Sequence, residues 1–185
     1  MAISAIVYNF EVQLSDVDRG VYEALEIRAA CHPSETEEYL LTRVLAYCLE
    51  YTEGLSFSRG LSSTDEPALS VRDLTGALQV WIDIGWPDAA RLHRASKAAP
   101  RVAVYTHKDA QQLVRHLSSE RIHRAEELEI YAVDRSLLAA LAARLERRLA
   151  FALAVNDRHL HLTLGSETLE GPITLLRLTP DGERR

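Results

Sequence analysis

Apolar and polar residues alternate along the beginning of the chain with the two-residue period of a half-buried strand. The pattern is regular from Ala5 to Leu14 and returns from Val21 to Ala30, where it also fits a helix. We interpret both stretches as strands. They predict an antiparallel pair joined by a turn at residues 15–18.

A helix is predicted to begin in the sequence HPSETEE. Pro33 disfavours a helical His32, Ser34 is a capping residue, and Glu37 three positions later completes a capping box. The helix is expected to run to about Glu50 and to be closed by residues 53–54. Its apolar stripe consists of Leu41, Val44, Leu45 and Cys48.

The middle of the chain has the pattern of strands interrupted by one helix. Residues 55–63 are predicted to form a strand with a bend at Gly60, and residues 68–72 and 77–84 to form a hairpin around Gly76. Asp88 is expected to cap a helix that ends near Ala99, with Leu92, Ala95 and Ala99 on its apolar face. The strand that follows, residues 101–108, should lie parallel to the second hairpin strand.

The last third of the chain predicts further alternation of helix and strand. Helices are expected at residues 109–117 and after Asp134, with Leu137, Leu138, Leu141 and Leu145 facing inward. Strands are expected at residues 128–133, 151–155, 159–164 and 171–178. These late strands should pair with the N-terminal ones in a second sheet.

Length and composition favour a single-domain globular protein over a membrane or secreted protein. The chain has 185 residues, 47% hydrophobic and 26% charged, and its net charge is −6. This length suits one domain spanning residues 1–185. No apolar run approaches the roughly 20 residues of a membrane helix and no secretory signal is visible, so we expect a cytoplasmic protein with no membrane partner. The acidic balance argues against general coating of DNA.

Acidic residues are predicted to converge at the open end of the hairpin. Counting outward from the turn places Asp83 opposite Pro67 or Ala68, within a step or two of Asp65 and Glu66. Close carboxylates repel unless a cation neutralises them, and Mg²⁺ favours oxygen ligands. The alternative is that residues 64–67 form an exposed acidic loop and that Asp83 alone faces water.

Basic residues are predicted on the helix that follows. Arg91, His93, Arg94 and Lys97 lie on the sides of this helix away from its apolar face. Arg94 and Lys97 are one turn apart, and either is a candidate to complete the acidic site or to bind phosphate, or else to be solvated surface. Glu38 lies on the apolar side of the first helix, so it either faces the core or a cleft or simply favours the helix dipole.

Three other groups of residues are of types that can form sites. Arg144, Arg147 and Arg148 form a basic cluster that either contacts a phosphate backbone or is a solvated helix end. His159 and His161 share one strand face, but no third ligand is evident, so no zinc site is predicted. Cys31 and Cys48 have no metal-pair spacing, and Cys48 is expected in the core.

Several motifs together resemble the YaeQ family. They are HPSET, GLSSTDEPAL, DLTG, WIDIG, the P-D-x-x-R-L pattern beginning at Pro87, and VYTH, spread over essentially the whole chain. The resemblance implies an α/β (α+β) fold of the PD-(D/E)XK nuclease superfamily. Its restriction-endonuclease-like αβββαβ core with a mixed sheet would occupy about residues 34–107. The terminal strands would form an additional antiparallel sheet.

The same resemblance implies roles for individual residues. Asp65, with Glu66, and Asp83 would bind Mg²⁺ or Mn²⁺, and Glu38 would support the metal. The sequence departs from the superfamily's pattern, because Gly85 stands at the position of the motif lysine and Pro67 follows the acids instead of preceding them. Lys97 or Arg94 would then replace the lysine, and Arg91 or Arg94 would bind phosphate.

Three functions follow as hypotheses. The first is a metal-dependent nuclease or phosphodiesterase acting on nucleic acid, in which metal held by Asp65 and Asp83 lowers the pKa of a bound water. The second is an inactive nuclease-fold protein that acts as a binding or regulatory module, supported by Gly85 and the acidic net charge. The third is a small-molecule-binding protein. A fold alone does not choose among them.

Overall fold

The computed structural model describes residues 4–58 and 65–179. It divides into two compact units, each built from two segments of the chain. The first unit contains the chain up to Leu49 and Val133–Thr174, and the second contains Glu50–Ala132 and the chain from Leu175 onward. Strands are assigned below to the unit that holds most of their residues. Among the described residues, no helix combines the length and apolar character needed to cross a membrane.

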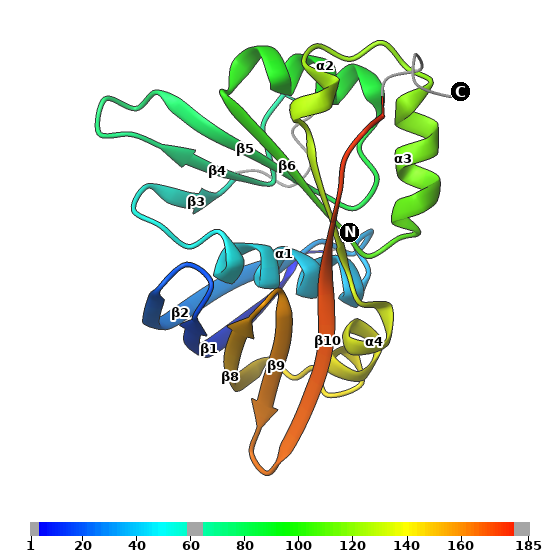
Figure 1. Ribbon diagram of the computed structural model, residues 1–185. Helices are drawn as coiled ribbons and strands as arrows, with labels where there is room; N and C mark the ends of the chain where they lie inside the picture. Colours follow the sequence, from blue (N-terminus) through cyan, green and yellow to red (C-terminus); the bar gives the residue numbers. More distant parts are fainter. Residues whose placement is uncertain (1–3, 59–64, 180–185) are drawn as a thin grey trace. The chain divides into compact units, whose positions relative to one another are not determined.

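The first unit joins the two ends of the chain in one sheet, and Figure 1 shows the blue N-terminal strands beside the orange late strands. The strand order is β2-β1-β8-β9-β10. The elements are β1 (Ile6–Asp16), β2 (Val21–Cys31), α1 (Glu37–Leu49), α4 (Arg135–Ala142), β8 (Arg148–Asn156), β9 (His159–Leu164) and β10 (Glu167–Leu176). The predicted N-terminal strand pair, the late hairpin and their union in one sheet are confirmed.

The predicted direction of this sheet is wrong at one pairing. β1 runs parallel to β8, with Val12 beside Phe151, whereas the other three pairings are antiparallel. The sheet is therefore mixed. The parallel pairing is possible because the long connection through the rest of the chain, unlike a hairpin turn, lets the chain return in the same direction.

Helix α1 begins later than predicted. The hydroxyl oxygen of Thr36 accepts a hydrogen bond from the Tyr39 amide at 3.1 Å, so Thr36 caps the helix. Ser34 lies outside the helix, and its hydroxyl is bonded to Nδ1 of His32 at 2.6 Å. The predicted capping box is therefore wrong.

The body of α1 is buried on more than the predicted stripe. All four predicted residues are in the core, and Leu40, Thr42, Arg43 and Ala46 are buried as well. Within the first unit the helix packs against both α4 and β2, which explains why one apolar face is not enough. The buried charge of Arg43 is stabilised by two contacts. Its Nη2 donates to the Ala30 carbonyl at 2.5 Å, and its guanidinium forms an ion pair with Glu35.

The second unit contains a mixed sheet with strand order β7-β6-β5-β4-β3. Its elements are β3 (Leu55–Phe57), β4 (Leu69–Arg72), β5 (Leu78–Ile84), α2 (Ala89–Ala98), β6 (Arg101–Thr106), α3 (Ala110–Ser118), the 3₁₀ turn η1 (Ala125–Glu127) and β7 (Glu129–Val133). β5, β6 and β7 are parallel, and β3, β4 and β5 are antiparallel. The central hairpin, the capped helix α2 and the parallel strand β6 are confirmed predictions.

Two turn glycines of this unit have the positive φ that the predicted turns need. Gly76 has φ +85° in the hairpin turn. Gly54 has φ +84°, and a Cβ there would lie 2.1 Å from the Arg72 carbonyl oxygen, so it permits the close approach of β3 to β4 rather than closing α1. The predicted bend at Gly60 lies outside the described residues.

The core of the second unit forms where α2 and α3 contribute apolar side chains to those of the parallel strands. Trp81, Val102, Val104 and Ile130 come from the strands, and the helices add Leu92, Ala95, Leu113 and Leu117. Burial of each large aliphatic side chain contributes roughly 1.5–3 kcal/mol to folding. This core fixes β5 and α2, the two elements that carry the predicted acid and the predicted basic residues.

The second unit also contains a partly buried polar network. The Arg101 guanidinium donates to both carboxylate oxygens of Glu50, at 2.6 and 2.9 Å, and to Glu129 at 2.6 Å. The Tyr105 hydroxyl donates to Glu50 at 2.7 Å, and the Tyr131 hydroxyl donates to Glu129 at 3.0 Å. The two tyrosine rings stack with centroids 4.7 Å apart. The network therefore ties the residue after α1 to β6 and β7.

Candidate functional site

Asp83 is a buried carboxylate near the end of β5, with 2% of its surface exposed. It is the predicted metal ligand of that strand. Both of its oxygens accept hydrogen bonds from Arg91 of α2, from Nε at 2.8 Å and from Nη2 at 2.8 Å. This two-point pair neutralises a charge that would otherwise be expensive to bury.

Arg91 is held by further contacts from the same unit. Its Nη2 donates to the Glu66 backbone carbonyl at 2.6 Å, and its guanidinium carbon lies 5.4 Å from the centre of the Trp81 ring. The Asp88 side chain caps α2 by accepting from the Arg91 amide at 2.7 Å. Arg91 thus joins the segment before β4, the end of β5 and the first turn of α2.

The acidic residues before β4 are placed differently from Asp83. The side chains of Asp65 and Glu66 are exposed, in a turn that precedes the strand. Leu69 pairs with Ile82, which agrees with the predicted position of Asp83 close to Ala68. The structure therefore brings the Glu66 backbone to Arg91 and, through it, to Asp83. The role of Asp65 and Glu66 as metal ligands stays a prediction.

Gly85, the residue expected at the position of a nuclease-motif lysine, has a backbone conformation that favours glycine. Its φ is +86°, and its amide donates to the Tyr105 carbonyl at 2.8 Å, continuing the pairing of β5 with β6. A side chain at positive φ costs roughly 1–2 kcal/mol. The local backbone conformation therefore suits the glycine that the sequence has at this position.

The other basic candidates lie on α2, and Glu38 lies elsewhere. Arg94 and Lys97 have exposed side chains. The helix contains three residues of positive charge and no acidic residue. Glu38 is half-buried in α1, in the first unit, whereas Asp65 and Asp83 are in the second. Its predicted support of a metal stays a prediction.

The donor set at Asp83 does not fit Mg²⁺ as the side chains stand. Mg²⁺ needs carboxylate lone pairs that are open to it, together with several waters. Both Asp83 oxygens are hydrogen-bonded to a guanidinium, which remains charged at any ordinary pH. What the arrangement can do chemically is present a neutralised acid beside an exposed basic helix surface.

The first unit contains two further groups considered from the sequence, the arginine cluster and the histidine pair. Arg144 is ion-paired with Glu167, and Arg147 lies over the Tyr8 ring at 5.9 Å, so these two arginines have intramolecular partners. The expectation that His159 and His161 lack a third ligating partner is wrong, because Glu170 of β10 lies beside them. Only the cross-strand register reveals Glu170, which no spacing within β9 can indicate.

The predicted core position of Cys48 is confirmed. Cys48 is a buried core residue, and burial raises the pKa of its thiol to about 12. Burial, with the nearby Glu35 carboxylate, also raises the pKa of the Cys31 thiol. Neither thiol has the lowered pKa of a nucleophilic cysteine.

The two-point pairing of Asp83 with Arg91 is not predicted from the sequence. The two residues are eight positions apart, across a strand end and a helix cap, so no helical or strand period connects them. The available signal is the P-D-x-x-R pattern, because it places Arg91 in the first turn of the helix that Asp88 caps, and helical side chains lean toward the helix N-terminus. The predicted role of Arg91 was phosphate binding instead.

Comparison with known proteins extends over nearly the whole chain. The family model described as YaeQ protein matches residues 1–172. The uncharacterized protein YaeQ of Escherichia coli (strain K12) is 30% identical over 175 residues, which cover 94% of this chain and 97% of that protein. The corresponding protein of Salmonella typhi is also 30% identical over 175 residues, with the same coverage.

Solved structures give the same result. The crystal structure of YaeQ protein from Pseudomonas syringae has a TM-score of 0.83 and 33% identity, covering 96% of this chain and 97% of that chain. The YaeQ protein from Xanthomonas axonopodis pv. citri has a TM-score of 0.79 and 30% identity, covering 95% and 100% of the two chains. The chain therefore belongs to the YaeQ family.

Proposed function

We propose that this protein is a binding or regulatory module that keeps a PD-(D/E)XK nuclease fold without metal-dependent hydrolysis. The order α1, β3, β4, β5, α2, β6 is the order of the nuclease core and supports that assignment of fold. The observation that carries the functional proposal is the two-point pair between Asp83 and Arg91. An arginine here takes the neutralising role that a divalent metal has in an active relative.

The partner we propose is nucleic acid, contacted through phosphate. The chain carries a net charge of −6, yet α2 contains arginine and lysine without any acidic residue. Arg94 and Lys97 are exposed and one turn apart, so both can reach the same stretch of a phosphate backbone. A local basic surface of this kind is what an acidic chain needs in order to bind a polyanion.

A second candidate function is metal-dependent phosphodiester hydrolysis. It is favoured by one observation, a carboxylate almost completely buried near the end of β5 and linked through Arg91 to the segment that carries Asp65 and Glu66. This function requires Arg91 to leave Asp83 so that the carboxylate becomes open to Mg²⁺ or Mn²⁺. Metal-dependent cleavage distinguishes the two candidates.

The test measures binding and cleavage of single- and double-stranded DNA and RNA in one set of samples. Fluorescence anisotropy compares the wild type with the double variant Arg94→Ala, Lys97→Ala. We expect binding to weaken roughly tenfold or more. The slope of log K against log salt concentration should decrease in magnitude by about two, because two phosphate contacts are lost. Gel analysis with Mg²⁺ or Mn²⁺ should show intact nucleic acid.

The matched control is Arg115→Ala with Arg121→Ala, which removes the same charge from exposed residues outside α2. It should leave the affinity close to that of the wild type. Equal weakening in both double variants would contradict a site on α2. Cleavage that requires divalent metal and is abolished by Asp83→Asn would establish the second candidate instead.

A further inference from the structure

β9 presents two histidines on the face of the sheet opposite to the core. Leu160 and Leu162 are fully buried, with 0% of their surface exposed. Residues alternate between the two faces of a strand, so His159 and His161 share the other face, and both are half-buried. Their ring centroids are 4.9 Å apart, which places the two imidazoles within reach of one ion.

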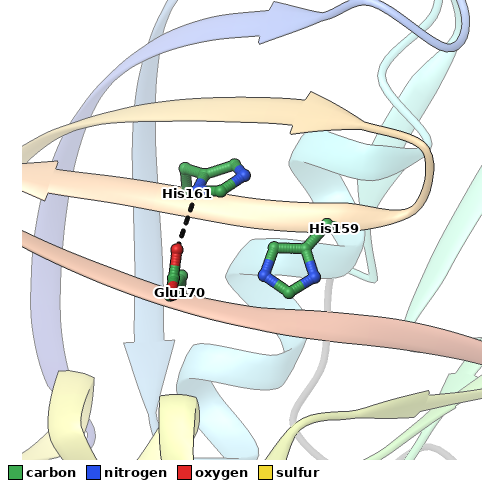
Figure 2. A group of neighbouring side chains, drawn as sticks. All are labelled: His159, His161 and Glu170. Atoms are coloured by element: carbon green, nitrogen blue, oxygen red, sulfur yellow. Dashed lines mark ion pairs between the residues drawn. The ribbon is translucent and has the colours of Figure 1, made fainter.

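Glu170 completes a group of three side chains from two adjacent strands. β9 and β10 are antiparallel, and Glu170 is the direct partner of His161 in their register. Its Oε2 lies 3.3 Å from Nδ1 of His161. One ligating atom from each of the three residues lies within 4.8 Å of the others, and Figure 2 shows the side chains gathered on one face of the hairpin.

The backbone around these residues is held in place. The turn before β9 has positive φ at Asp157 and Arg158, 51° and 57°. The Asp18 carboxylate accepts hydrogen bonds from both amides of this turn, at 2.7 and 2.9 Å. The Ile173 amide donates to the Arg158 carbonyl at 2.8 Å, so the start of β9 is also fixed on its other side.

We propose that His159, His161 and Glu170 form a binding site for a first-row transition dication, with Zn²⁺ as the ion. Two imidazole nitrogens and one carboxylate oxygen are ligands that Zn²⁺ accepts, whereas Mg²⁺ and Ca²⁺ prefer oxygen alone. Three protein ligands leave one position of a tetrahedral ion for water or for a donor from a partner. This site lies in the first unit and does not depend on the function proposed for Asp83 and α2.

The distances suit this ion with small side-chain rotations. Zn–N and Zn–O bonds of about 2.0–2.1 Å place neighbouring tetrahedral ligands about 3.3–3.4 Å apart. The His161–Glu170 separation of 3.3 Å already agrees with this spacing. On the other side of β9, His161 is paired with Ala154, whose methyl group is too short to cover the imidazole. The alternative is a plain surface ion pair between His161 and Glu170.

Isothermal titration calorimetry tests the proposal. The full chain is prepared without a polyhistidine tag and is treated with chelator before the titration. Zn²⁺ should bind with one-to-one stoichiometry and about micromolar or tighter affinity. His159→Ala and His161→Ala should each weaken binding by roughly tenfold or more, and Glu170→Gln should weaken it to a smaller extent. Bound Co²⁺ should give the intense visible absorption of a four-coordinate ion in the wild type and lose it in these variants.

The control variants are His116→Ala and Glu146→Gln, which remove a histidine and an acid at exposed positions outside the group. Both should bind Zn²⁺ as the wild type does. Thermal unfolding without metal verifies that every variant is folded. Absence of one-to-one binding in the folded wild type, or binding that survives in His161→Ala, would overturn the proposal.

Discussion

At the scale of single residues, the organising feature of the second unit is a buried charge with one dedicated partner. The side chain of Asp83 is 3% exposed and that of Arg91 is 21% exposed. Removing one member of such a pair leaves the other charge without compensation, which is more destabilising than removing both. Arg91 is therefore expected to stabilise the fold and to determine whether Asp83 is open to a ligand.

The substitution Arg91→Ala should lower the free energy of unfolding by about 3 kcal/mol, because Asp83 is left buried and unpaired. Urea denaturation measures the change. Lys97→Ala on the same helix should change stability by no more than about 0.5 kcal/mol, since its side chain is exposed. The double variant Asp83→Leu, Arg91→Met should recover most of the loss, and a loss as large as in Arg91→Ala would contradict the pairing argument.

Gly85 gives a second residue-level prediction. Gly85→Lys introduces the lysine that the proposed nuclease fold would have at this position, but φ of +86° should make the variant roughly 1–2 kcal/mol less stable on backbone grounds alone. Gly85→Ala carries the same backbone cost without the amine and serves as the comparison. We expect neither variant to cleave nucleic acid with Mg²⁺. Cleavage by the lysine variant alone would show that the site lacks only its amine.

At the scale of elements, the start of α1 shows where local sequence is ambiguous. Ser34 and Thr36 are both capping residues, and the sequence favours Ser34 because Glu37 follows at the correct spacing. In the structure, the Glu35 carboxylate accepts from the His32 amide at 3.1 Å and pairs with Arg43. These contacts fix residues 32–35 as a separate turn, so the helix begins after Thr36.

Thr36→Ala should therefore destabilise the protein by about 1 kcal/mol, through loss of the cap on α1. Ser34→Ala should have a clearly smaller effect, because its hydroxyl is bonded to the His32 ring and not to an amide of the helix. Chemical denaturation of the two variants under identical conditions measures both changes. The reverse order of effects would mean that the helix is capped by Ser34 after all.

The polar network of β6 and β7 predicts a dependence of stability on pH. Burial disfavours the charged form of Glu129, but hydrogen bonding and attraction from Arg101 outweigh it, so its pKa is lowered from 4.5. A carboxyl with a lower pKa in the folded state stabilises the protein above its unfolded pKa, and this contribution is lost as pH falls through the folded value.

Thermal unfolding between about pH 3 and pH 7 tests this sign. The wild type should lose stability on acidification, and Glu129→Gln should lose less over the same range because it has no proton to bind. The exposed acid variant Glu146→Gln should follow the wild-type curve. A Glu129→Gln curve parallel to that of the wild type would contradict the role of the network.

At the scale of the whole molecule, local sequence patterns predicted most helices and strands but not which strands pair or which distant side chains meet. The alternation in β1 is read correctly because one face of that strand is buried at Phe10, Val12 and Leu14. Its parallel pairing with β8 joins segments more than a hundred residues apart, which no local period encodes. The same limit applies to Glu170 beside His161 and to Arg91 beside Asp83.

The most direct test of the central claim is calorimetric titration of Mg²⁺ and Mn²⁺ into the wild type and into Asp83→Asn. Asparagine keeps the shape of the side chain and a hydrogen-bond acceptor for Arg91 while removing the charge. Because Arg91 holds both Asp83 oxygens, we predict that neither ion binds at Asp83 and that the two proteins give the same heats at millimolar metal. Binding to the wild type that disappears in a folded Asp83→Asn variant would contradict the account and identify a metal-dependent site.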